Sequence, residues 1–227
     1  MPTALVTGAN RGIGLGLVKE LLNRGWRVFA CCRNPLVKEL KALAVSEHLR
    51  LFELDVTNAD DIKKLAKQCT QPIDVLMNVA GIYGPSGLRF GDTPVESWLE
   101  VFKVNTIAPL KICEALVGRV AESELKLTVA ISSEMGSITN NNWGNAYLYR
   151  SSKAALNAVV KSLSIDLADK GITAIAIHPG WVKTDMGGPD ATLTIEKSCH
   201  HIVDLISSSE SLASGEFYDY LGDKLAW

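Results

Sequence analysis

Short apolar runs alternate along this chain with longer segments of helical periodicity, and this alternation limits its fold more than any other feature. Repeated strand–helix–strand units of this kind build parallel sheets. Runs such as Ala4-Leu5-Val6 and Val28-Phe29-Ala30 are apolar throughout, as strands buried on both faces should be. We expect strands at Ala4–Thr7, Arg27–Cys31, Leu49–Glu53, Ile73–Met77, Leu125–Ile131 and Ile172–His178, and a weaker one at Glu216–Tyr220. We expect helices to begin near Gly12, Pro35, Asn58, Pro94, Asn145 and Thr192.

The pattern predicts an α/β fold: a Rossmann-type, doubly wound and mostly parallel sheet of about seven strands with helices on both faces. A chain of 227 residues is longer than the usual domain, but α/β domains of roughly 200–250 residues are common. The sequence has no linker, low-complexity tract or internal repeat that would divide it. We therefore expect a single domain spanning residues 1–227.

Composition and charge narrow the functions that are open to the chain. The net charge of -2 and the scattered basic residues argue against a nucleic-acid partner, because phosphate binding needs gathered positive charge. No apolar stretch reaches the ~20 residues of a membrane helix, and no basic leader precedes the first strand. We therefore expect no membrane association and a cytoplasmic location. Cysteines without CxxC spacing and histidines without an HExxH pattern predict no disulfide framework and no metal site.

A glycine-rich turn, Thr7-Gly8-Ala9-Asn10-Arg11-Gly12-Ile13-Gly14, joins the first predicted strand to the first predicted helix. Glycines at such a junction permit a tight turn and let the backbone approach a pyrophosphate, while the helix N-terminus offers free N–H groups and a positive dipole. A glycine-rich loop is also an ordinary structural turn in many proteins. Its place within a strand–helix–strand unit at the start of the chain nevertheless favours a dinucleotide site.

Tyr149 and Lys153 are four residues apart in a predicted helix, so their side chains leave the same face about one turn apart. A tyrosine ordinarily titrates near pH ~10, and acid–base work at neutral pH calls for a pKa lower by about three units. We expect the Lys153 ammonium to lower the pKa of Tyr149. The alternative is an ordinary pair on a helix surface. Tyr147 is the weaker candidate because Ser151, which carries no charge, lies four residues further on.

Further motifs follow in order along the chain: Asp55-Val56, Asn78-Val79-Ala80-Gly81, Asn105, Ser132-Ser133 and Pro179-Gly180. Together with Thr-Gly-xxx-Gly-Ile-Gly and Tyr-xxx-Lys, they make the sequence resemble the short-chain dehydrogenases/reductases over nearly its whole length. The segments around Tyr149 and Pro179 look like those of the C-factor and sniffer-type carbonyl reductases. Val79 departs from the family pattern, since many members have a second asparagine there.

The resemblance implies an oxidoreductase that transfers hydride between NADP(H) and a small-molecule carbonyl or alcohol substrate. Tyr149 would be the general acid/base, Ser133 would hydrogen-bond the substrate oxygen, and Lys153 would hold the nicotinamide ribose. Asn105 would complete the catalytic set by anchoring a water that links Lys153 to solvent. The motif does not separate Ser132 from Ser133, and alignment of the preceding strand favours Ser133.

The cofactor-binding set that the resemblance implies follows the ends of several strands. It consists of Gly8, Asn10, Arg11, Gly12, Ile13, Gly14, Arg33, Asp55, Val56, Asn78, Ala80, Gly81, Tyr149, Lys153, Pro179, Gly180, Val182 and Thr184. The second strand ends in Cys31-Cys32-Arg33 and lacks the carboxylate that would bind the ribose hydroxyls of NAD(H). Arg33 and Arg11 would clamp a 2′-phosphate, so NADP(H) is favoured and NAD(H) stays possible. The alternative for Arg33 is that it merely opens a polar turn.

The remaining expectations concern the substrate side and the assembly. The loop Gly180–Thr192 leaves the carboxyl end of a strand and is expected to act as a lid. The loop Ser86–Asp92 should help to shape the substrate pocket, and Trp143, Trp181 and Met186 are candidates to line it. The resemblance implies a homodimer or homotetramer. A non-catalytic dinucleotide-binding sensor or signalling protein on the same fold is the competing function. A sugar-nucleotide epimerase is disfavoured by the glycine spacing.

Overall fold

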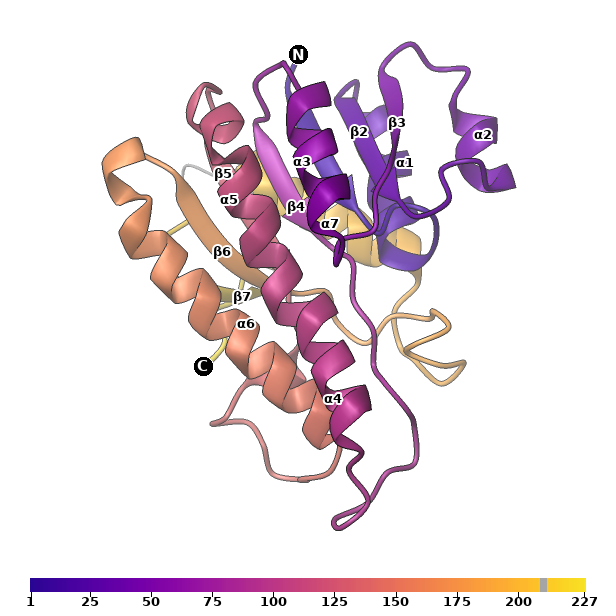
Figure 1. Ribbon diagram of the computed structural model, residues 1–227, viewed down its shortest axis with the longest axis vertical. Helices are drawn as coiled ribbons and strands as arrows, with labels where there is room; N and C mark the ends of the chain where they lie inside the picture. Colours follow the sequence, from indigo (N-terminus) through magenta and orange to yellow (C-terminus); the bar gives the residue numbers. More distant parts are fainter. Residues whose placement is uncertain (209–211) are drawn as a thin grey trace.

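The computed structural model, which describes residues 1–208 and 212–227, is built around one seven-stranded sheet (Figure 1). The strands are β1 Thr3–Thr7, β2 Arg27–Cys32, β3 Leu49–Glu53, β4 Val75–Asn78, β5 Leu127–Ile131, β6 Thr173–His178 and β7 Phe217–Asp219. They lie in the order β3-β2-β1-β4-β5-β6-β7, and neighbouring strands pair in parallel. The winding reverses between β1 and β4, which is where open α/β sheets bind their ligands.

Helices cover both faces of this sheet (Figure 1). They are α1 Gly12–Asn23, α2 Lys38–Leu43, α3 Ala59–Gln68, α4 Val95–Phe102, α5 Ala108–Ala121, α6 Tyr147–Asp166 and α7 Ile195–Ser207. On one face, α1 and α7 pack against β1 and β4 through residues such as Leu17 and Ile202. On the other face, α3 and α5 pack through Ile62 and Leu116, and α6 covers β5 and β6 through Leu156. The sheet is therefore buried on both sides, as its continuous apolar runs predict.

The seven predicted strands are confirmed, and no strand end differs from its expected position by more than two residues. Asn58 caps α3 by accepting hydrogen bonds from two backbone N–H groups, and Thr194 caps α7 by accepting one. The helical pattern expected to begin near Pro94 is more complex than a single helix. It runs through α4, a π-helical turn at Lys103–Ile107 and then α5. The sequence pattern did not reveal this turn, which adds one residue to a helix that continues on both sides of it.

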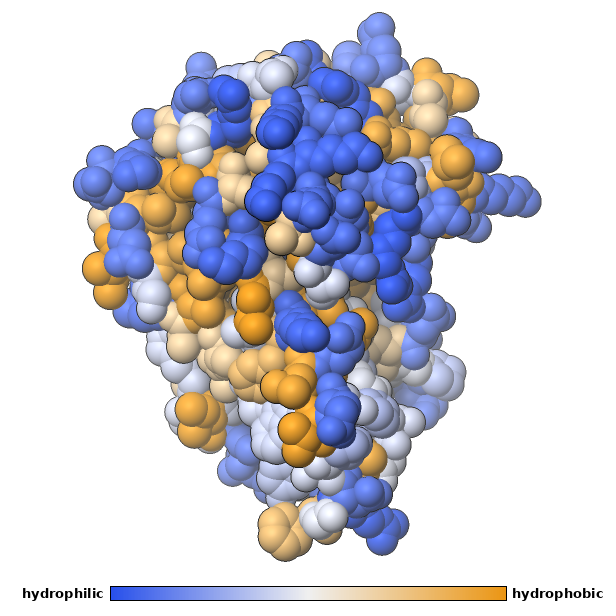
Figure 2. Space-filling view, viewed as in Figure 1, coloured by the Kyte–Doolittle hydropathy of each residue, from blue (hydrophilic) through white to orange (hydrophobic). Residues whose placement is uncertain are grey.

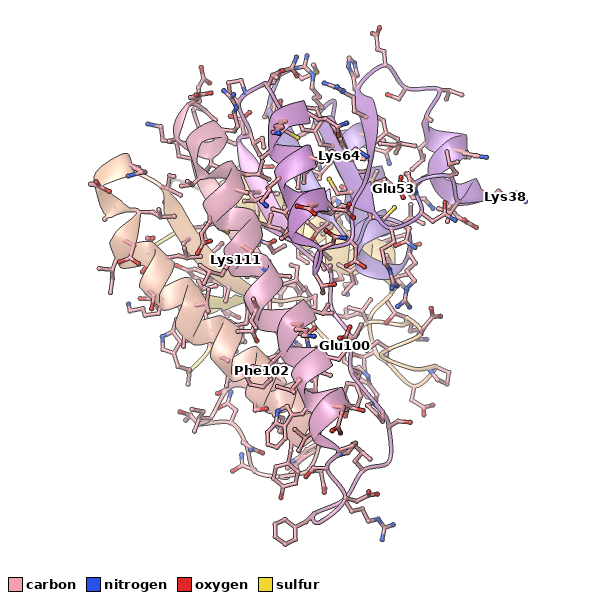
Figure 3. All side chains as sticks on the ribbon, viewed as in Figure 1. Lys38, Glu53, Lys64, Glu100, Phe102 and Lys111 are labelled. Carbon is pink, nitrogen blue, oxygen red and sulfur yellow. The ribbon has the colours of Figure 1, made fainter. Side chains whose placement is uncertain are left out.

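The helices of the face seen in Figure 1 are amphipathic. Leu65 of α3 and Ile112 of α5 are buried, whereas Lys64 and Lys111 beside them are exposed (Figure 3). Hydrophilic residues dominate the surface over α3, and more hydrophobic ones gather beside α5 and α6 (Figure 2). Across residues 1–208 and 212–227, no helix is both long enough and apolar enough to cross a bilayer.

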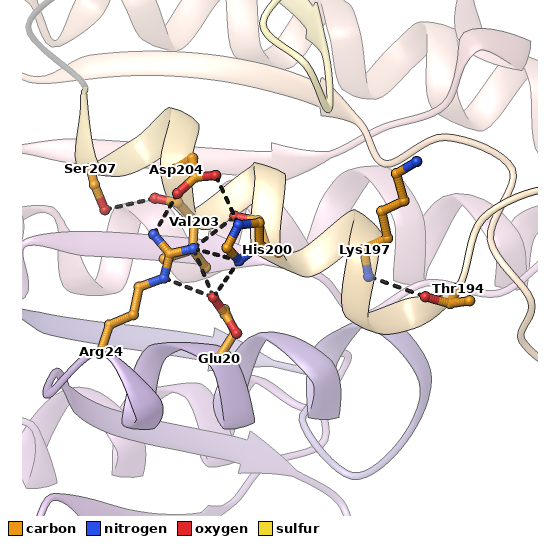
Figure 4. A network of polar contacts seen from close by, with 8 residues as sticks. All are labelled: Glu20, Arg24, Thr194, Lys197, His200, Val203, Asp204 and Ser207. Atoms are coloured by element: carbon orange, nitrogen blue, oxygen red, sulfur yellow. Dashed lines mark hydrogen bonds and ion pairs between the residues drawn. The ribbon is translucent and has the colours of Figure 1, made fainter.

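A polar network joins α1 to α7 (Figure 4). Arg24, directly after α1, pairs with Glu20 at 2.7 Å and with Asp204 of α7 at 2.6 Å. The His200 ring nitrogen Nδ1 lies 3.0 Å from the Glu20 carboxylate. Partly exposed ion pairs contribute little each to stability, so the main effect is to set how α7 lies on α1. This packing matters for the site, since α1 starts at the glycine turn and α7 follows the loop after β6.

Candidate active site

The expected site residues gather at one edge of the sheet, where the carboxyl ends of the parallel strands meet. The glycine turn follows β1, Arg33 follows β2, Asp55 and Val56 follow β3, Asn78, Ala80 and Gly81 lie at and after the end of β4, Ser133 follows β5, and Pro179, Gly180, Val182 and Thr184 follow β6. Tyr149 and Lys153 come from the first turns of α6. Segments far apart in the sequence therefore share this edge because the strands run in one direction.

Two glycines of the turn after β1 leave no room for a side chain. Gly8 has a φ of +66°, and a Cβ there would lie 2.9 Å from the Ala80 Cα. A Cβ on Gly14 would overlap the Gly8 carbonyl oxygen. The left-handed backbone region costs other residues roughly 1–2 kcal/mol. These glycines therefore allow β1, the exit of β4 and the start of α1 to approach one another.

Thr7, the last residue of β1, holds this turn in place. Its Oγ1 accepts hydrogen bonds from the backbone N–H groups of Val79 at 2.9 Å and Ala80 at 3.1 Å. Helix α1 starts at Gly12, and no side chain among the described residues caps its N-terminus. Uncapped N–H groups at a helix start suit an anion, so the turn fits the pyrophosphate of a dinucleotide. Thr7 was not among the expected site residues, although it is the first residue of the Thr-Gly-xxx-Gly-Ile-Gly motif.

Tyr149, Lys153 and Ser133 lie together, and each is less than a tenth exposed. The Lys153 Nζ is 5.7 Å from the centre of the Tyr149 ring. The Ser133 hydroxyl lies close enough to the Tyr149 phenol to lower its pKa. Ser132 instead donates from its hydroxyl to the Asn157 Oδ1 at 2.6 Å. The hydroxyl that lies beside the phenol is therefore that of Ser133.

The ionisation of the tyrosine and the lysine differs from the expectation. Burial raises the pKa of Tyr149 to about 12, while the nearby Ser133 hydroxyl acts in the opposite direction. Burial lowers the pKa of Lys153 to about 8, and its Nζ donates a 2.8 Å hydrogen bond to the Ile131 carbonyl. The expectation that Lys153 depresses the pKa of Tyr149 is wrong for the protein alone. Desolvation penalises the charged form of both groups and is the largest cause of both shifts.

Asn105 lies in the π-helical turn between α4 and α5 and is fully buried. Its Oδ1 accepts from the Ile82 N–H at 2.9 Å, and its Nδ2 donates to the Ile82 carbonyl at 2.8 Å and to the Ser152 Oγ at 3.0 Å. These bonds connect the exit of β4 to α6 one residue before Lys153. Single π turns within helices are frequent at functional sites. The Asn105 side chain is bound to protein groups, so it positions its neighbours.

The chain after β4 passes directly beside the lysine. A Cβ on Gly81 would lie 3.3 Å from the Asn105 Oδ1 and 3.6 Å from the Lys153 Nζ. Asn78, at the end of β4, is buried with its Nδ2 at 3.5 Å from the Cys113 sulfur. Its Oδ1 has no hydrogen-bond partner within the described part of the chain. The exit of β4 thus lies between the glycine turn and the buried face of α6.

Of the two arginines expected to clamp a phosphate, Arg11 pairs with a carboxylate and Arg33 lies near enough to Asp55 to act on its charge. Arg11 lies with its Nη1 2.9 Å from the Asp185 Oδ2, and both side chains are exposed. Asp55 accepts hydrogen bonds from the Thr57 N–H at 2.9 Å and the Thr57 hydroxyl at 2.7 Å. These bonds and, to a smaller extent, the charge of Arg33 lower the pKa of Asp55. Arg33 is exposed as well, so both guanidinium groups are accessible to a further anion.

The loop after β6 rests on the glycine turn. Val182 and Leu193 form an isolated parallel bridge that holds the two ends of the loop together. A Cβ on Gly12 would lie 3.6 Å from the Thr184 Cγ2. The next residue of the loop, Asp185, forms the ion pair with Arg11. The expected lid therefore contacts the start of α1, and its movement stays a prediction.

A cavity of about 220 Å³ opens beside Tyr149. Two segments supply its walls, and the lining residues are Tyr83, Pro85, Gly87, Leu88, Asn145, Ala146, Tyr147, Leu148 and Tyr149. Gly87 and Leu88 belong to the loop Ser86–Asp92, as expected. Trp143, Trp181 and Met186, which we expected as pocket residues, are exposed and are not among the lining residues. Tyr83 was missed because a single tyrosine in a loop has no spacing partner in the sequence.

Comparison with known proteins agrees with this geometry. A family model described as short chain dehydrogenase matches residues 2–192. C-signal from Myxococcus xanthus is 41% identical over 161 residues, which are 70% of this chain and 95% of that protein. The carbonyl reductase Sniffer of D. melanogaster superposes with a TM-score of 0.93 at 38% identity, covering 100% of both chains. An NADPH-bound carbonyl reductase from chicken fatty liver has a TM-score of 0.91 at 33% identity, covering 100% of this chain and 99% of that one. Sequence, strand order and site geometry thus lead to one conclusion: the chain belongs to the short-chain dehydrogenase family.

Proposed function

We propose that this protein is an NADP(H)-dependent oxidoreductase of the carbonyl reductase type, with Tyr149 as its general acid/base. The proposal rests on the buried cluster in which the Ser133 hydroxyl meets the Tyr149 phenol while Lys153 lies near the same ring. A carbonyl oxygen gains negative charge as it is reduced. Preorganised donors in a site without bulk water stabilise such an oxygen.

Tyr149 supplies the proton in this proposal. Because burial raises its pKa to about 12, the phenol is protonated at neutral pH, as a donor to a carbonyl oxygen must be. Ser133 donates its hydroxyl hydrogen to the same oxygen and holds it beside the phenol. Lys153, with a pKa of about 8, is charged at pH 7 and stabilises the phenolate that remains after the transfer. Asn105 is a positioning residue that holds the exit of β4 against α6.

NADP(H), when bound, supplies or accepts the hydride. The N-terminus of α1 and the turn at Gly8 are suited to its pyrophosphate, and Arg11 and Arg33 to the 2′-phosphate. The end of β2 offers Arg33 where an NAD(H) site would have a carboxylate, and Arg11 comes from the turn after β1. NADPH in the chicken carbonyl reductase, a neighbour at 33% identity, supports the same preference. Asp55 would contact the adenine and Thr184 the nicotinamide end of the cofactor.

Replacing Tyr149 by Phe tests the proposal. NADPH oxidation with a panel of aldehydes, ketones and quinones should fall to background, because no other buried phenol lies beside Ser133 in the described residues. NADPH affinity, measured by fluorescence titration, should be unchanged. Tyr218→Phe is the matched control, since Tyr218 is a buried tyrosine of β7 that should not affect turnover. Near-normal activity of the Tyr149 variant would refute the assignment.

A second candidate is a dinucleotide-binding signalling protein without turnover. The 41% identity to C-signal supports it. The complete cluster of Ser133, Tyr149 and Lys153 supports catalysis, since a sensor needs no buried phenol. NADPH binding without oxidation by any carbonyl of the panel would favour the signalling protein. The cytoplasmic location and the homodimeric or homotetrameric state stay predictions from the sequence.

A further inference from the structure

The cavity beside Tyr149 is lined by uncharged residues, three of which are tyrosines. Tyr83 and Leu88 line it from the loop after β4, and Tyr147 and Leu148 line it from the start of α6. None of the described residues that line it is charged. A charged group placed there would lose its hydration without gaining a partner. The cavity therefore suits a neutral compound, and its volume of about 220 Å³ is below the ~300–1,000 Å³ typical of sites for drug-sized ligands.

The ring of Tyr83 packs at a tilt against that of the candidate catalytic residue, Tyr149. The centres of the Tyr83 and Tyr149 rings are 4.9 Å apart, and the ring planes are inclined by 32°. This separation lies within the range in which aromatic rings attract each other. Burial dominates the raised pKa of Tyr149, and the proximity of Tyr83 contributes in the same direction.

The position of Tyr83 is set by the backbone residue before it. Ile82 exchanges two hydrogen bonds with the buried Asn105 side chain, at 2.9 Å through its N–H and 2.8 Å through its carbonyl. Tyr83 therefore leaves a fixed point of the backbone, although it belongs to a loop. A ring held in this way can select among ligands by shape, since it does not move aside at little cost.

We infer that Tyr83 is a specificity-determining residue, whose ring forms a wall of the substrate cavity and selects neutral carbonyl compounds conjugated to a flat ring. This inference rests on the proposed function, because it takes Tyr149 as the residue at which the carbonyl reacts. A flat ring gains an aromatic contact with Tyr83 while its carbonyl reaches the Tyr149 phenol. A saturated ring of similar size is thicker and gains no such contact.

The test compares benzaldehyde with cyclohexanecarbaldehyde, which have rings of similar size but different thickness. The measurement is kcat/KM for each aldehyde with NADPH, in the wild type, Tyr83→Leu and Tyr83→Phe. The ratio of the benzaldehyde value to the cyclohexanecarbaldehyde value should fall by about twofold to tenfold in Tyr83→Leu, mainly through KM for benzaldehyde. Tyr83→Phe keeps the ring and should keep the ratio. Trp143→Leu, which removes an exposed aromatic residue that does not line the cavity, is the matched control and should keep it too.

The outcomes separate this inference from the proposed function. An unchanged ratio in Tyr83→Leu, in a wild type that reduces both aldehydes, overturns the inference and leaves the function standing. If none of the carbonyl compounds tested supports NADPH oxidation by the wild type, both the inference and the proposed function are refuted. If Tyr83→Leu does not fold, inhibition of the wild-type enzyme by two alcohols tests the inference instead. Benzyl alcohol should inhibit the reaction more strongly than cyclohexylmethanol, and equal inhibition would overturn the inference.

Discussion

The buried ammonium of Lys153 should reduce the stability of the fold, and Lys153→Met measures by how much. Burial lowers the pKa of this lysine from 10.5 to about 8. At about 1.4 kcal/mol per pKa unit, the folded state bears a penalty of roughly 3 kcal/mol for keeping the group charged. Because the unfolded chain holds the proton more tightly, the penalty is complete below about pH 8 and vanishes as the pH rises toward 10.5. Lys153 is 4% exposed, so solvent screening reduces this figure little.

Urea unfolding of the wild type and of Lys153→Met at pH values from 7 to 10 is the assay. The variant also loses the 2.8 Å hydrogen bond to the Ile131 carbonyl, worth about 1 kcal/mol, so it should be more stable by about 2 kcal/mol at pH 7. Between pH 7 and pH 10 the advantage should shrink by about 2 kcal/mol, because most of the penalty has gone. The pKa of Tyr149 is about 12 in the folded state and ~10 in the unfolded chain. This residue therefore lowers the stability only above pH ~10, and it does so in both proteins. Lys64→Met, at an exposed lysine of α3, is the control. A difference that stays constant from pH 7 to pH 10 would refute the reasoning.

Four further substitutions probe the rest of the site. Ser133→Ala should lower kcat by about 10²-fold with little effect on stability, because it removes a donor to the reacting oxygen. Ser132→Ala breaks a buried 2.6 Å hydrogen bond and should instead lower the free energy of unfolding by about 1–3 kcal/mol, so equal losses of activity in both variants would contradict the assignment. Gly8→Ala should weaken NADPH binding and lower the thermal midpoint, since its Cβ would lie 2.9 Å from the Ala80 Cα; an unchanged fluorescence titration would count against this. Arg33→Ala should reduce NADPH affinity about tenfold and leave NADH affinity unchanged, and a parallel loss of both would show that Arg33 does not face a 2′-phosphate.

Features that depend on neighbouring residues along the chain were accessible from the sequence. Continuous apolar runs predicted the buried parallel strands, because burial on both faces leaves no place for polar side chains. The spacing of Gly8, Gly12 and Gly14 predicted the tight turn into α1, and four-residue spacing put Tyr149 and Lys153 on one helix face. The site residues that follow strand ends were predictable for the same reason, since parallel strands place their carboxyl ends at one edge.

Tertiary structure decided what these groups do to one another. The pKa of Tyr149 goes up because the site is buried, and the four-residue spacing to Lys153 carries no information on burial. The two adjacent serines are equivalent as sequence, but in the fold Ser133 lies beside the phenol of Tyr149 at the start of α6, whereas Ser132 hydrogen-bonds Asn157 further along the same helix. Tyr83 joins the site only because Asn105, from a π turn that leaves no periodic signal, binds the backbone beside it. Spacing along the chain thus determined which groups share an element, and three-dimensional packing decided their distances, their exposure to water and therefore their chemistry.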